Sequence, residues 1–535
     1  MTILGLHKDP WHNTGACIIS DKNGSFDLSS VSEERLSREK DSRKFPEKTI
    51  KACMSQMNIK SYAEIDLVVT DYIEDKDWRK DNIEHEVKIN EILKEFPENR
   101  VVSVNHHLAH ACATYFSSPF KSAAILIIDG RGSGKETQSI FIAENNNIKL
   151  LESTDKMGIG LLYSTITKKI GFKVLEEGKT MRLAPYGKEY NRKIFNFPEN
   201  FKGIITNFED VMVLGKYELT KEYDKKILTS EDKAVTAYEI QELCEKVFLH
   251  LSNYAKKITN KEYLCLSGGS ALNSVSNYRV LKTGLFQDVF VNPAASDTGI
   301  PLGCALYGYH ILGKNPKTYK EISPYLGPEY APKDIEKAIN NFNGYEIIRE
   351  NTKPKAIEMI INNKIVAVFW GRSEIGPRAL GNRSIIVNPM IAENKDILNS
   401  RVKHRESFRP FAPAILVEHL QEYFDISRPE PYMLMVPPVK EDKKKIIPAV
   451  THYDGTGRVQ SVSKELNKNF YEMIDLFYQK TGVPVLLNTS FNVAGEPIVE
   501  SPTDAIKCFL GTGIDALLFE NILLVKNTNE DKKIS

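Results

Sequence analysis

The chain has 535 residues, 41% of them hydrophobic, which allows about two to four folded domains and excludes a largely disordered protein. Its 71 basic and 70 acidic side chains nearly cancel and leave a net charge of +1. Chains that bind nucleic acid through their overall charge are strongly basic, so this balance argues against nucleic acid and requires any anion site to be local.

The cysteines and apolar runs indicate where in the cell the protein is expected. Seven cysteines are widely spread and none forms a C-x-x-C pair, which argues against a disulfide framework and a zinc finger. No uncharged apolar run approaches the roughly 18 residues of a membrane-spanning helix, and the apolar stretch within residues 1–9 is too short for a signal peptide. We therefore expect a cytoplasmic protein with no membrane partner.

The first part of the chain alternates predicted strands and helices. Two short strands, over residues 3–6 and 16–20, are joined by a loop that carries His12. Later apolar runs predict strands over residues 67–70, 123–128, 263–266 and 289–291. Helices are expected around residues 33–51 and over 105–115 and 236–258. This alternation is typical of an α/β fold.

Two stretches of the first part predict less regular structure. The sequence Leu-Ala-Pro-Tyr-Gly over residues 183–187 suggests a rigid turn, because proline and glycine both interrupt helices. Residues 190–235 are charged and irregular, and we expect a peripheral excursion there.

The second domain begins after a cluster of prolines and glycines over residues 316–332, which marks the expected exit from the first domain. A helix over residues 332–341 is expected to link the halves. We place the domains at residues 1–345 and 346–535. Predicted strands of the second domain include residues 365–370, 414–416 and 483–487.

His106 and His110 are four residues apart in a predicted helix, so both imidazoles lie on one face. That spacing suits two ligands of one metal ion, although core and capping histidines are more common. Asp129, at the end of a strand, and Asp297, in a turn, could complete the ligand set; each is equally explained as a turn residue or helix cap. Two histidines with two aspartates would favour a divalent transition metal.

Glycine-rich turns follow three predicted strands of the first domain. Residues 130–134, the pair Gly268 and Gly269, and Gly299 could present backbone amides to a nucleotide phosphate. One such turn is commonly just a tight turn, whereas three in one domain favour a nucleotide pocket. Lys179, in a Glu-Gly-Lys sequence, could contribute a cation. The chain has neither a Walker-type motif nor a Gly-x-Ser-x-Gly elbow with an obvious histidine partner.

Basic tracts in the second domain predict a pocket for a small, highly anionic substrate. Arg372, Arg378 and Arg383 lie among glycines directly after a predicted strand, and a second basic tract covers residues 403–411. Arginine holds phosphate by paired hydrogen bonds, which favours this interpretation over a solvated loop. Polar residues 488–492 could contact a bound amide or phosphate, or form a cap or turn.

These tracts, in this order and over nearly the whole chain, resemble the bacterial O-carbamoyltransferases of the nodulation and antibiotic-tailoring type. The most specific match is the sequence Gly-Pro-Arg-Ala-Leu-Gly-Asn-Arg-Ser over residues 376–384. The other matching tracts are residues 106–110, 129–130, 177–179, 183–187, 267–273, 295–297, 408–413 and 488–492.

The resemblance implies two folds and two reactions. The first domain is expected to have the metal- and nucleotide-binding fold of the actin, sugar kinase and heat-shock chaperone (ASKHA) superfamily, and the second a YrdC-like α/β fold. The YrdC-like domain would make carbamoyl adenylate from carbamoyl phosphate and ATP, with Mg²⁺ accompanying the ATP. The first domain would transfer the carbamoyl group to a hydroxyl of a sugar or natural product near a bound divalent metal, Fe(II).

The resemblance also implies residue roles. The metal ligands would be His106, His110, Asp129 and Asp297. Carbamoyl phosphate would be held by Arg378, Arg383, Lys403, Arg409, Asn488 and Ser490. Nucleotide contacts would come from Gly130, Lys179, Gly268, Gly269 and Asn273, with Arg458 at the activation site.

His12 would be the general base for the acceptor hydroxyl, since imidazole titrates near neutral pH. The family usually has His-Asp-Ala-Ser-Ala where this chain has His-Asn-Thr-Gly-Ala over residues 12–16. Replacing the acid by Asn13 changes what could orient His12.

Three other functions compete with this interpretation. A tRNA threonylcarbamoyl-transferring enzyme uses both folds, normally as separate proteins, and the neutral charge does not favour tRNA. A hydrogenase-maturation carbamoyltransferase normally adds an acylphosphatase domain and cysteine-rich zinc motifs. A non-catalytic nucleotide-binding homologue is hard to reconcile with the retained arginines, histidines and aspartates. We expect ATP, carbamoyl phosphate and a hydroxylated small molecule as partners, and a homodimer by resemblance.

Overall fold

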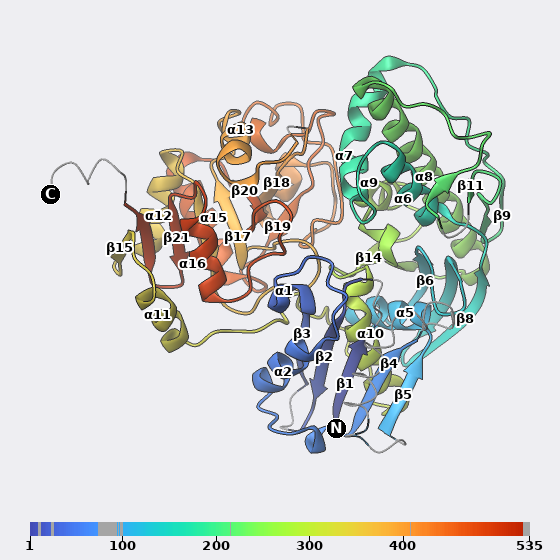
Figure 1. Cartoon of the computed structure of the whole chain (residues 1–535), viewed down its shortest axis with the longest axis horizontal. Coiled ribbons are helices and arrows are strands. Elements are labelled where there is room, and N and C mark those ends of the chain that lie inside the picture. The colour runs from blue at the N-terminus through green and yellow to red at the C-terminus, as the bar shows by residue number, and fades with distance from the viewer. Residues whose placement is uncertain are drawn as a thin grey trace. The chain divides into compact units, whose positions relative to one another are not determined.

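The computed structural model describes residues 1–8, 12–22, 26–72, 94, 96, 100–213, 216–406 and 408–527. The chain folds into two compact units (Figure 1). The first comprises Met1–Glu33 and Asp41–Ile322, and the second Glu34–Lys40 and Ser323–Ser535. The main change of unit thus falls within the proline- and glycine-rich stretch over residues 316–332. The functional division after residue 345 stays a prediction.

The first unit contains the same five-stranded sheet topology twice. The first sheet has the order β3-β2-β1-β4-β5, and the second has the order β8-β7-β6-β13-β14. In each sheet the three strands that come first in sequence pair antiparallel with their neighbours. The fourth strand is parallel to the first, and the fifth is parallel to the fourth. The strands are β1 (Thr2–His7), β2 (Gly15–Ser20), β3 (Asp27–Ser32), β4 (Leu67–Asp71), β5 (Val101–Val104), β6 (Ser122–Ile128), β7 (Gln138–Glu144), β8 (Asn147–Thr154), β13 (Tyr263–Ser267) and β14 (Asp288–Val291). This duplication is the arrangement expected of an ASKHA-like domain, so that prediction is confirmed.

Two helices pack between the two sheets of the first unit. Helix α10 (Ile300–Leu306) packs against β1, β2 and β4, whereas α5 (His106–Ser117) packs against β6 and β13. The two helices also pack against each other. A Cβ atom on Gly303 of α10 would lie 2.0 Å from the carbonyl oxygen of Ala109 of α5, so only glycine allows this close approach. Because Ala109 lies between His106 and His110, the contact brings the start of α10 next to both histidines.

The remaining helices of the first unit include one correction. They are α1 (Glu33–Ser37), which continues into the second unit, α2 (Glu47–Gln56), α6 (Ile159–Lys169), α7 (Glu177–Gly187), α8 (Ser230–Thr259) and α9 (Ser274–Lys282). The turn expected over residues 183–187 is wrong, because these residues form the last part of α7 with Pro185 inside it. Pro185 has no N–H to donate to the preceding turn, so this end of the helix lacks one backbone hydrogen bond.

The charged stretch over residues 190–235 contains two small hairpins and the start of a helix. The hairpins are β9 (Phe201–Lys202) with β10 (Ile205–Thr206), and β11 (Met212–Val213) with β12 (Glu218–Leu219). Helix α8 begins earlier than predicted because Thr229 and Asp232 form a capping box before the apolar periodicity starts.

The second unit is built on one eight-stranded mixed sheet with the order β15-β22-β21-β16-β17-β20-β18-β19. Its strands are β15 (Tyr345–Ile348), β16 (Val366–Phe369), β17 (Arg383–Val387), β18 (Ala412–Leu416), β19 (Gln460–Val462), β20 (Val485–Ser490), β21 (Ala516–Phe519) and β22 (Leu523–Lys526). Its helices are α11 (Pro332–Asn340), α12 (Thr352–Ile361), α13 (Asn394–Leu398), α14 (Leu420–Tyr423), α15 (Lys468–Thr481) and α16 (Pro502–Leu510). Both units therefore confirm the predicted α/β class.

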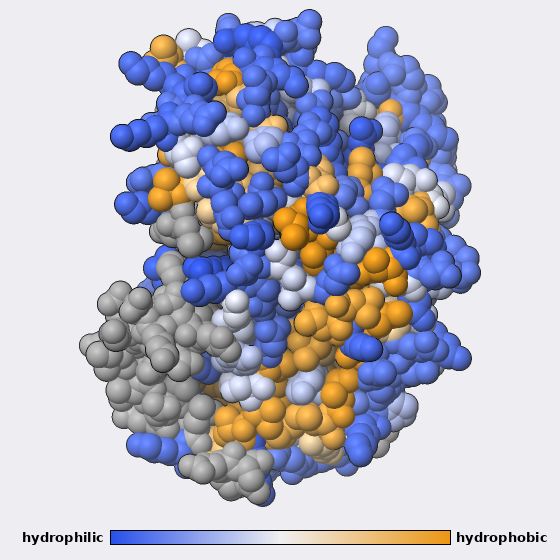
Figure 2. All heavy atoms as spheres, turned by 90° about the vertical axis from the view of Figure 1, so that its right-hand side faces the viewer, coloured by the Kyte–Doolittle hydropathy of each residue, from blue (hydrophilic) through white to orange (hydrophobic). Residues whose placement is uncertain are grey.

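One face of the molecule is mostly polar. Figure 2 shows one face on which hydrophilic side chains dominate and hydrophobic ones gather in the lower half of the view. The exposed large apolar side chains of the first unit include Leu150 and Tyr319, about half of whose surface is accessible (48% and 49%). Within the described ranges, every helix is too short or too polar to cross a bilayer.

Candidate metal centre and anion site

The carboxyl ends of the central strands in the first unit carry polar residues. His7 ends β1, Asp71 ends β4, Ser267 ends β13, and Asp129 directly follows β6. Ligands of open α/β sheets bind beyond these ends, because helices and loops leave a crevice there. The strand ends therefore supply side chains to one site.

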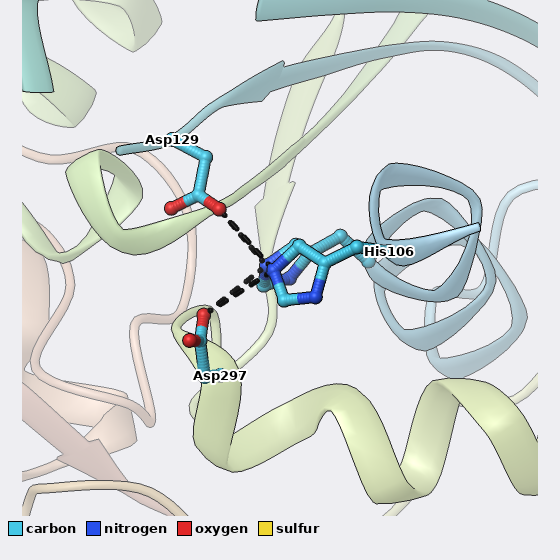
Figure 3. A group of neighbouring side chains, drawn as sticks. His106, Asp129 and Asp297 are labelled. Carbon is cyan, nitrogen blue, oxygen red and sulfur yellow. Dashed lines mark ion pairs between the residues drawn. The ribbon is translucent and has the colours of Figure 1, made fainter. Parts of the chain in front are cut away.

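The residues expected to bind metal come together at this site. The Nε2 atom of His106 lies 3.3 Å from Oδ2 of Asp129 and 3.6 Å from Oδ1 of Asp297. The Nε2 atom of His110 lies 3.6 Å and 3.5 Å from the same two oxygens. Figure 3 shows both carboxylates pointing toward His106 on its helix, with dashed lines along the ion pairs. His107 faces elsewhere, with Nδ1 2.7 Å from the hydroxyl of Ser139.

The spacing of these four atoms fits a bound transition metal. An ion with ligand bonds of about 2.0 to 2.2 Å at the centre of a tetrahedron would separate its ligand atoms by about 3.4 Å, close to the distances found here. The Nε2 atoms of His106 and His110 are buried and have no hydrogen-bond partner of good geometry. Two imidazoles with two carboxylates form a donor set that divalent transition metals accept.

The charges of the site keep its carboxylates ionised. Burial alone would raise the pKa of Asp129 and Asp297, but the facing histidines more than offset it, so both pKa values lie well below the ordinary range. Burial likewise would lower the pKa of His106, whereas its three neighbouring aspartates raise it well above its usual value. The aspartates are therefore available as anionic ligands.

The glycine turn after β13 supports Asp129. The backbone amide of Gly269 donates to Oδ1 of Asp129 at 2.8 Å, which leaves Oδ2 for the histidines. Gly268 has a φ of 91°, and a Cβ atom there would lie 2.4 Å from the carbonyl oxygen of Ile128. Both glycines, expected at the nucleotide, thus help to place Asp129, a candidate metal ligand.

The other residues expected at a nucleotide have varied surroundings. Asn273 caps α9 by accepting from the amide of Ser276, and its side chain also donates to Gln241. Lys179 pairs with Glu176 at 2.8 Å. Gly130 differs from these, since a Cβ atom there would meet nothing within 4 Å. The backbone of Gly130 is therefore open on its Cβ side, as is that of Gly178 beside Lys179.

His12, the expected base, lies beside the metal centre. Its Nδ1 atom is 3.5 Å from Oδ2 of Asp297 and 3.1 Å from the side-chain nitrogen of Asn13. A quarter of the His12 side chain is exposed, in contrast to the buried His106 and His110. Asp297 thus places a carboxylate near Nδ1, where the family's usual acid at position 13 is missing.

A cluster of cations lies in the second unit. Its members are Arg378, Lys403, Arg405, Arg409 and Arg458. Burial and the neighbouring arginines lower the pKa of Arg378 to about 10 and of Arg405 to about 9, and the pKa of Arg458 and Lys403 well below normal. One carboxylate, that of Glu406, lies 3.6 Å from Arg409. Nitrogens of Arg378, Arg405 and Arg458 are buried without a hydrogen-bond partner. We therefore regard the cluster as an anion site.

The carboxyl end of β20 borders this cluster. The Nζ atom of Lys403 contacts the carbonyl of Ser490 and donates to the carbonyl and side-chain oxygens of Asn492 at 2.9 and 2.8 Å. Asn488 donates to the carbonyl of Ala379, the residue after Arg378, at 3.2 Å. The amide oxygen of Asn488 is buried without a partner. The polar residues expected near the phosphate thus lie next to the cationic side chains.

Arg383 has a different environment from the other arginines. It is fully buried and donates to the carbonyls of Trp370, Asn382, Gly371 and Pro328 at 2.7 to 3.4 Å. Its guanidinium carbon also lies 3.7 Å from the centre of the Phe369 ring. These contacts brace the loop between β16 and β17, which carries Arg378.

Sequence reasoning did not single out Arg405, His7, Asp71 or Ser267. Arg405 lies in the basic tract over residues 403–411 and stacks over Phe411 at 4.5 Å. Asp71 directly follows the strand predicted over residues 67–70, so its position at a strand end was a usable signal. His7 and Ser267 likewise end strands, and Ser267 opens the matching tract over residues 267–273, which was a further usable signal.

Comparisons with known proteins agree with this division into two units. The model for the carbamoyltransferase N-terminus matches residues 68–306, and the model for the carbamoyltransferase C-terminus matches residues 357–526. Nodulation protein NolNO of Sinorhizobium fredii is 34% identical over 564 residues, covering 98% of this chain and 80% of its own. An uncharacterized protein of Methanocaldococcus jannaschii is 34% identical over 536 residues, covering 96% and 98%. The crystal structure of full-length HypF in its phosphate- and nucleotide-bound form covers 58% of this chain and 55% of its own, with 14% identity and a TM-score of 0.32.

Proposed function

The chain belongs to the carbamoyltransferase family, and we propose that it is an ATP-dependent O-carbamoyltransferase with a hydroxylated small molecule as acceptor. In this proposal the second unit makes carbamoyl adenylate from carbamoyl phosphate and ATP. The first unit then transfers the carbamoyl group to the acceptor hydroxyl.

The observation that carries the proposal is the cationic cluster of the second unit. Several cations repel one another there and keep buried nitrogens without partners, an arrangement that costs stability unless an anion binds. Carbamoyl phosphate carries the charge and the acceptor oxygens that such donors require. Asn488 adds an unpartnered amide oxygen, which could accept from the carbamoyl NH₂ group.

The first half-reaction follows from this site. Water attacks the carbamoyl carbon and the bond from that carbon to the phosphate oxygen breaks. Carbamate forms, and the arginine cluster holds the inorganic phosphate that is released. An oxygen of the resulting carbamate attacks the α-phosphorus of ATP, and pyrophosphate leaves. Arg378 and Arg458 stabilise the negative charge that develops on the phosphate oxygens, because fixed donors in a buried site need no reorganisation.

The second half-reaction belongs to the first unit. His12 takes the proton of the acceptor hydroxyl at Nε2, with Nδ1 directed to Asp297. The acceptor oxygen bonds to the carbamoyl carbon, the bond from that carbon to the adenylate oxygen breaks, and AMP leaves. His106, His110, Asp129 and Asp297 would hold a divalent metal, for which we propose Fe(II) and which would polarise the carbonyl of the donor.

The proposal is tested by pyrophosphate release from the purified full chain with ATP, Mg²⁺ and Fe(II). We expect release only when carbamoyl phosphate is present. The variant Arg378→Ala should lower the rate by roughly 10- to 100-fold, since hydrogen bonds to a charged group contribute about 1.5 to 3 kcal/mol. The matched control Arg349→Ala removes an arginine of the same unit that is 53% exposed and paired with Glu336, and should keep the wild-type rate.

Pyrophosphate release at the same rate with and without carbamoyl phosphate would contradict the proposal. An absence of release from folded, metal-loaded protein would favour the threonylcarbamoyl or non-catalytic alternatives.

A further inference from the structure

Asp71 holds two histidines of the first unit at once. Its carboxylate lies 3.0 Å from Nδ1 of His7, through either oxygen, and 3.0 Å from Nδ1 of His106. All three side chains are buried, with at most 3% of their surface exposed. A buried carboxylate between two imidazoles can accept a hydrogen bond from each ring N–H that faces it.

These hydrogen bonds decide which ring nitrogen is free. When His106 is neutral, as a metal ligand must be, and its Nδ1 donates to Asp71, Nε2 carries the lone pair, and this is the atom 3.3 Å from Asp129. His7 is held at Nδ1 in the same way, and its Nε2 lies 3.8 Å from Oδ2 of Asp297, beyond hydrogen-bond distance. Asp71 thus turns one imidazole toward the metal centre and a second toward one of its carboxylates.

The repeated topology gives His110 an equivalent support. Strands β4 and β13 occupy the same place in the two sheets, and Asp71 and Ser267 are their last residues. The hydroxyl of Ser267 lies 3.3 Å from Nδ1 of His110 and donates to the carbonyl of Ala295 at 3.1 Å. Since its proton is used there, Ser267 is placed to accept from His110. Each strand end therefore supports one histidine of α5.

We propose that Asp71 is a positioning residue of the metal centre, which fixes the tautomer and ring orientation of His106. This inference rests on the proposed metal centre. Outer carboxylates of this kind typically change metal affinity by about 10- to 100-fold. Ser267 has the same part for His110, but a neutral hydroxyl at a longer distance should contribute less.

The test is the affinity of the purified full chain for Co(II), measured by chelator competition and by the visible absorption of the bound ion. We expect Asp71→Asn to weaken binding by about 10- to 100-fold and to shift the absorption bands, because Asn can donate to Nδ1 and permit the wrong tautomer. Ser267→Ala should weaken binding less. The control Asp66→Asn lies near the start of the same strand, where Asp66 accepts from the amide of Thr2, and should bind as wild type.

The outcomes separate the two claims. If wild type binds Co(II) and Asp71→Asn binds within twofold with the same spectrum, the positioning role is overturned while the metal centre stands. If wild type itself binds no Co(II), the centre fails and the inference with it. Carbamoyl phosphate-dependent pyrophosphate release by each variant should stay at the wild-type rate, since it belongs to the other unit.

A second variant covers the case in which Asp71→Asn does not fold. His7→Leu leaves Asp71 in place but removes the second ring nitrogen that holds its carboxylate. Its affinity for Co(II) should fall several-fold because Asp71 is less well fixed, and an unchanged affinity overturns the positioning role.

Discussion

At the scale of single residues, arginines of one sequence tract have different surroundings. Arg378 has a buried nitrogen without a partner and a pKa lowered to about 10 by burial and by Arg409. Arg383, five positions later, also has a buried Nε atom without a partner, but its other nitrogens face carbonyls and the buried carboxylate of Glu500 at 3.8 Å, and an aromatic ring stacks on it. The family resemblance assigns both to carbamoyl phosphate, whereas the contacts of Arg383 lead us to propose that it braces the loop that presents Arg378.

Replacing Arg383 distinguishes these roles. Arg383→Lys loses the planar donor set and the stacking on Phe369, and we expect the free energy of unfolding to fall by about 3 kcal/mol. Denaturant unfolding of the variant measures this, with Arg349→Lys on the surface as control. Unchanged unfolding together with a raised KM for carbamoyl phosphate would instead assign Arg383 to the substrate.

Gly268 offers a second test at the residue scale. A methyl group there would collide with the carbonyl of Ile128, directly before Asp129. We expect Gly268→Ala to weaken Co(II) binding and to lower the free energy of unfolding by more than about 2 kcal/mol. Gly284→Ala is the control, because Gly284 also has a positive φ but a Cβ atom there meets nothing within 4 Å. Equal effects of the two changes would show that backbone strain alone, without the collision, explains the loss.

At the scale of elements, helices place the site by close packing and by single buried contacts. Helices α5 and α10 approach through Gly303 and Ala109, which sets Asp297 against the histidines. Helix α8 holds the charged stretch over residues 190–235 through one buried carboxylate. The carboxylate of Glu239, on α8, accepts from the backbone amides of Ile194 and Phe195 at 3.0 to 3.2 Å.

The contact of Glu239 predicts a pH dependence of stability. Burial raises the pKa of Glu239 from 4.5 to about 7, although the two amides oppose this. Because the folded state favours the neutral acid, stability is lost as the pH rises from the unfolded pKa through about 7. Glu239→Gln keeps an acceptor and cannot ionise. Between pH 5 and 8 its free energy of unfolding should therefore rise relative to wild type by about 2 kcal/mol. Parallel pH curves would contradict this account.

Elements also show what the sequence could predict. Long apolar runs located β1, β4, β6, β13, β16 and β20 to within a few residues, because burial on both faces of a sheet leaves a continuous pattern. The edge strand β8 was missed, since its side chains are mostly exposed. The last part of α7, residues 183–187, resembles a turn in sequence because it contains Pro185 and Gly187.

At the scale of the whole molecule, two features were not predictable from local pattern. The duplicated sheets share strand order and direction but no visible sequence repeat, so the duplication appears only in the topology. Asp71 ends β4 and His106 begins α5, so their contact is visible only once the fold places these two elements side by side. The four proposed metal ligands, in contrast, were chosen from spacing, strand ends and resemblance, and the fold brings all four together.

The central claim is that activation and transfer are separate reactions of two units. The measurement that tests it most directly follows both half-reactions in His110→Ala and Arg378→Ala. One assay detects carbamoyl phosphate-dependent pyrophosphate release, and the other detects loss of added carbamoyl adenylate to a hydroxylated acceptor. We predict that His110→Ala keeps the first and loses the second, and that Arg378→Ala does the reverse. If His110→Ala loses activation and keeps transfer, the proposed division between the units is wrong.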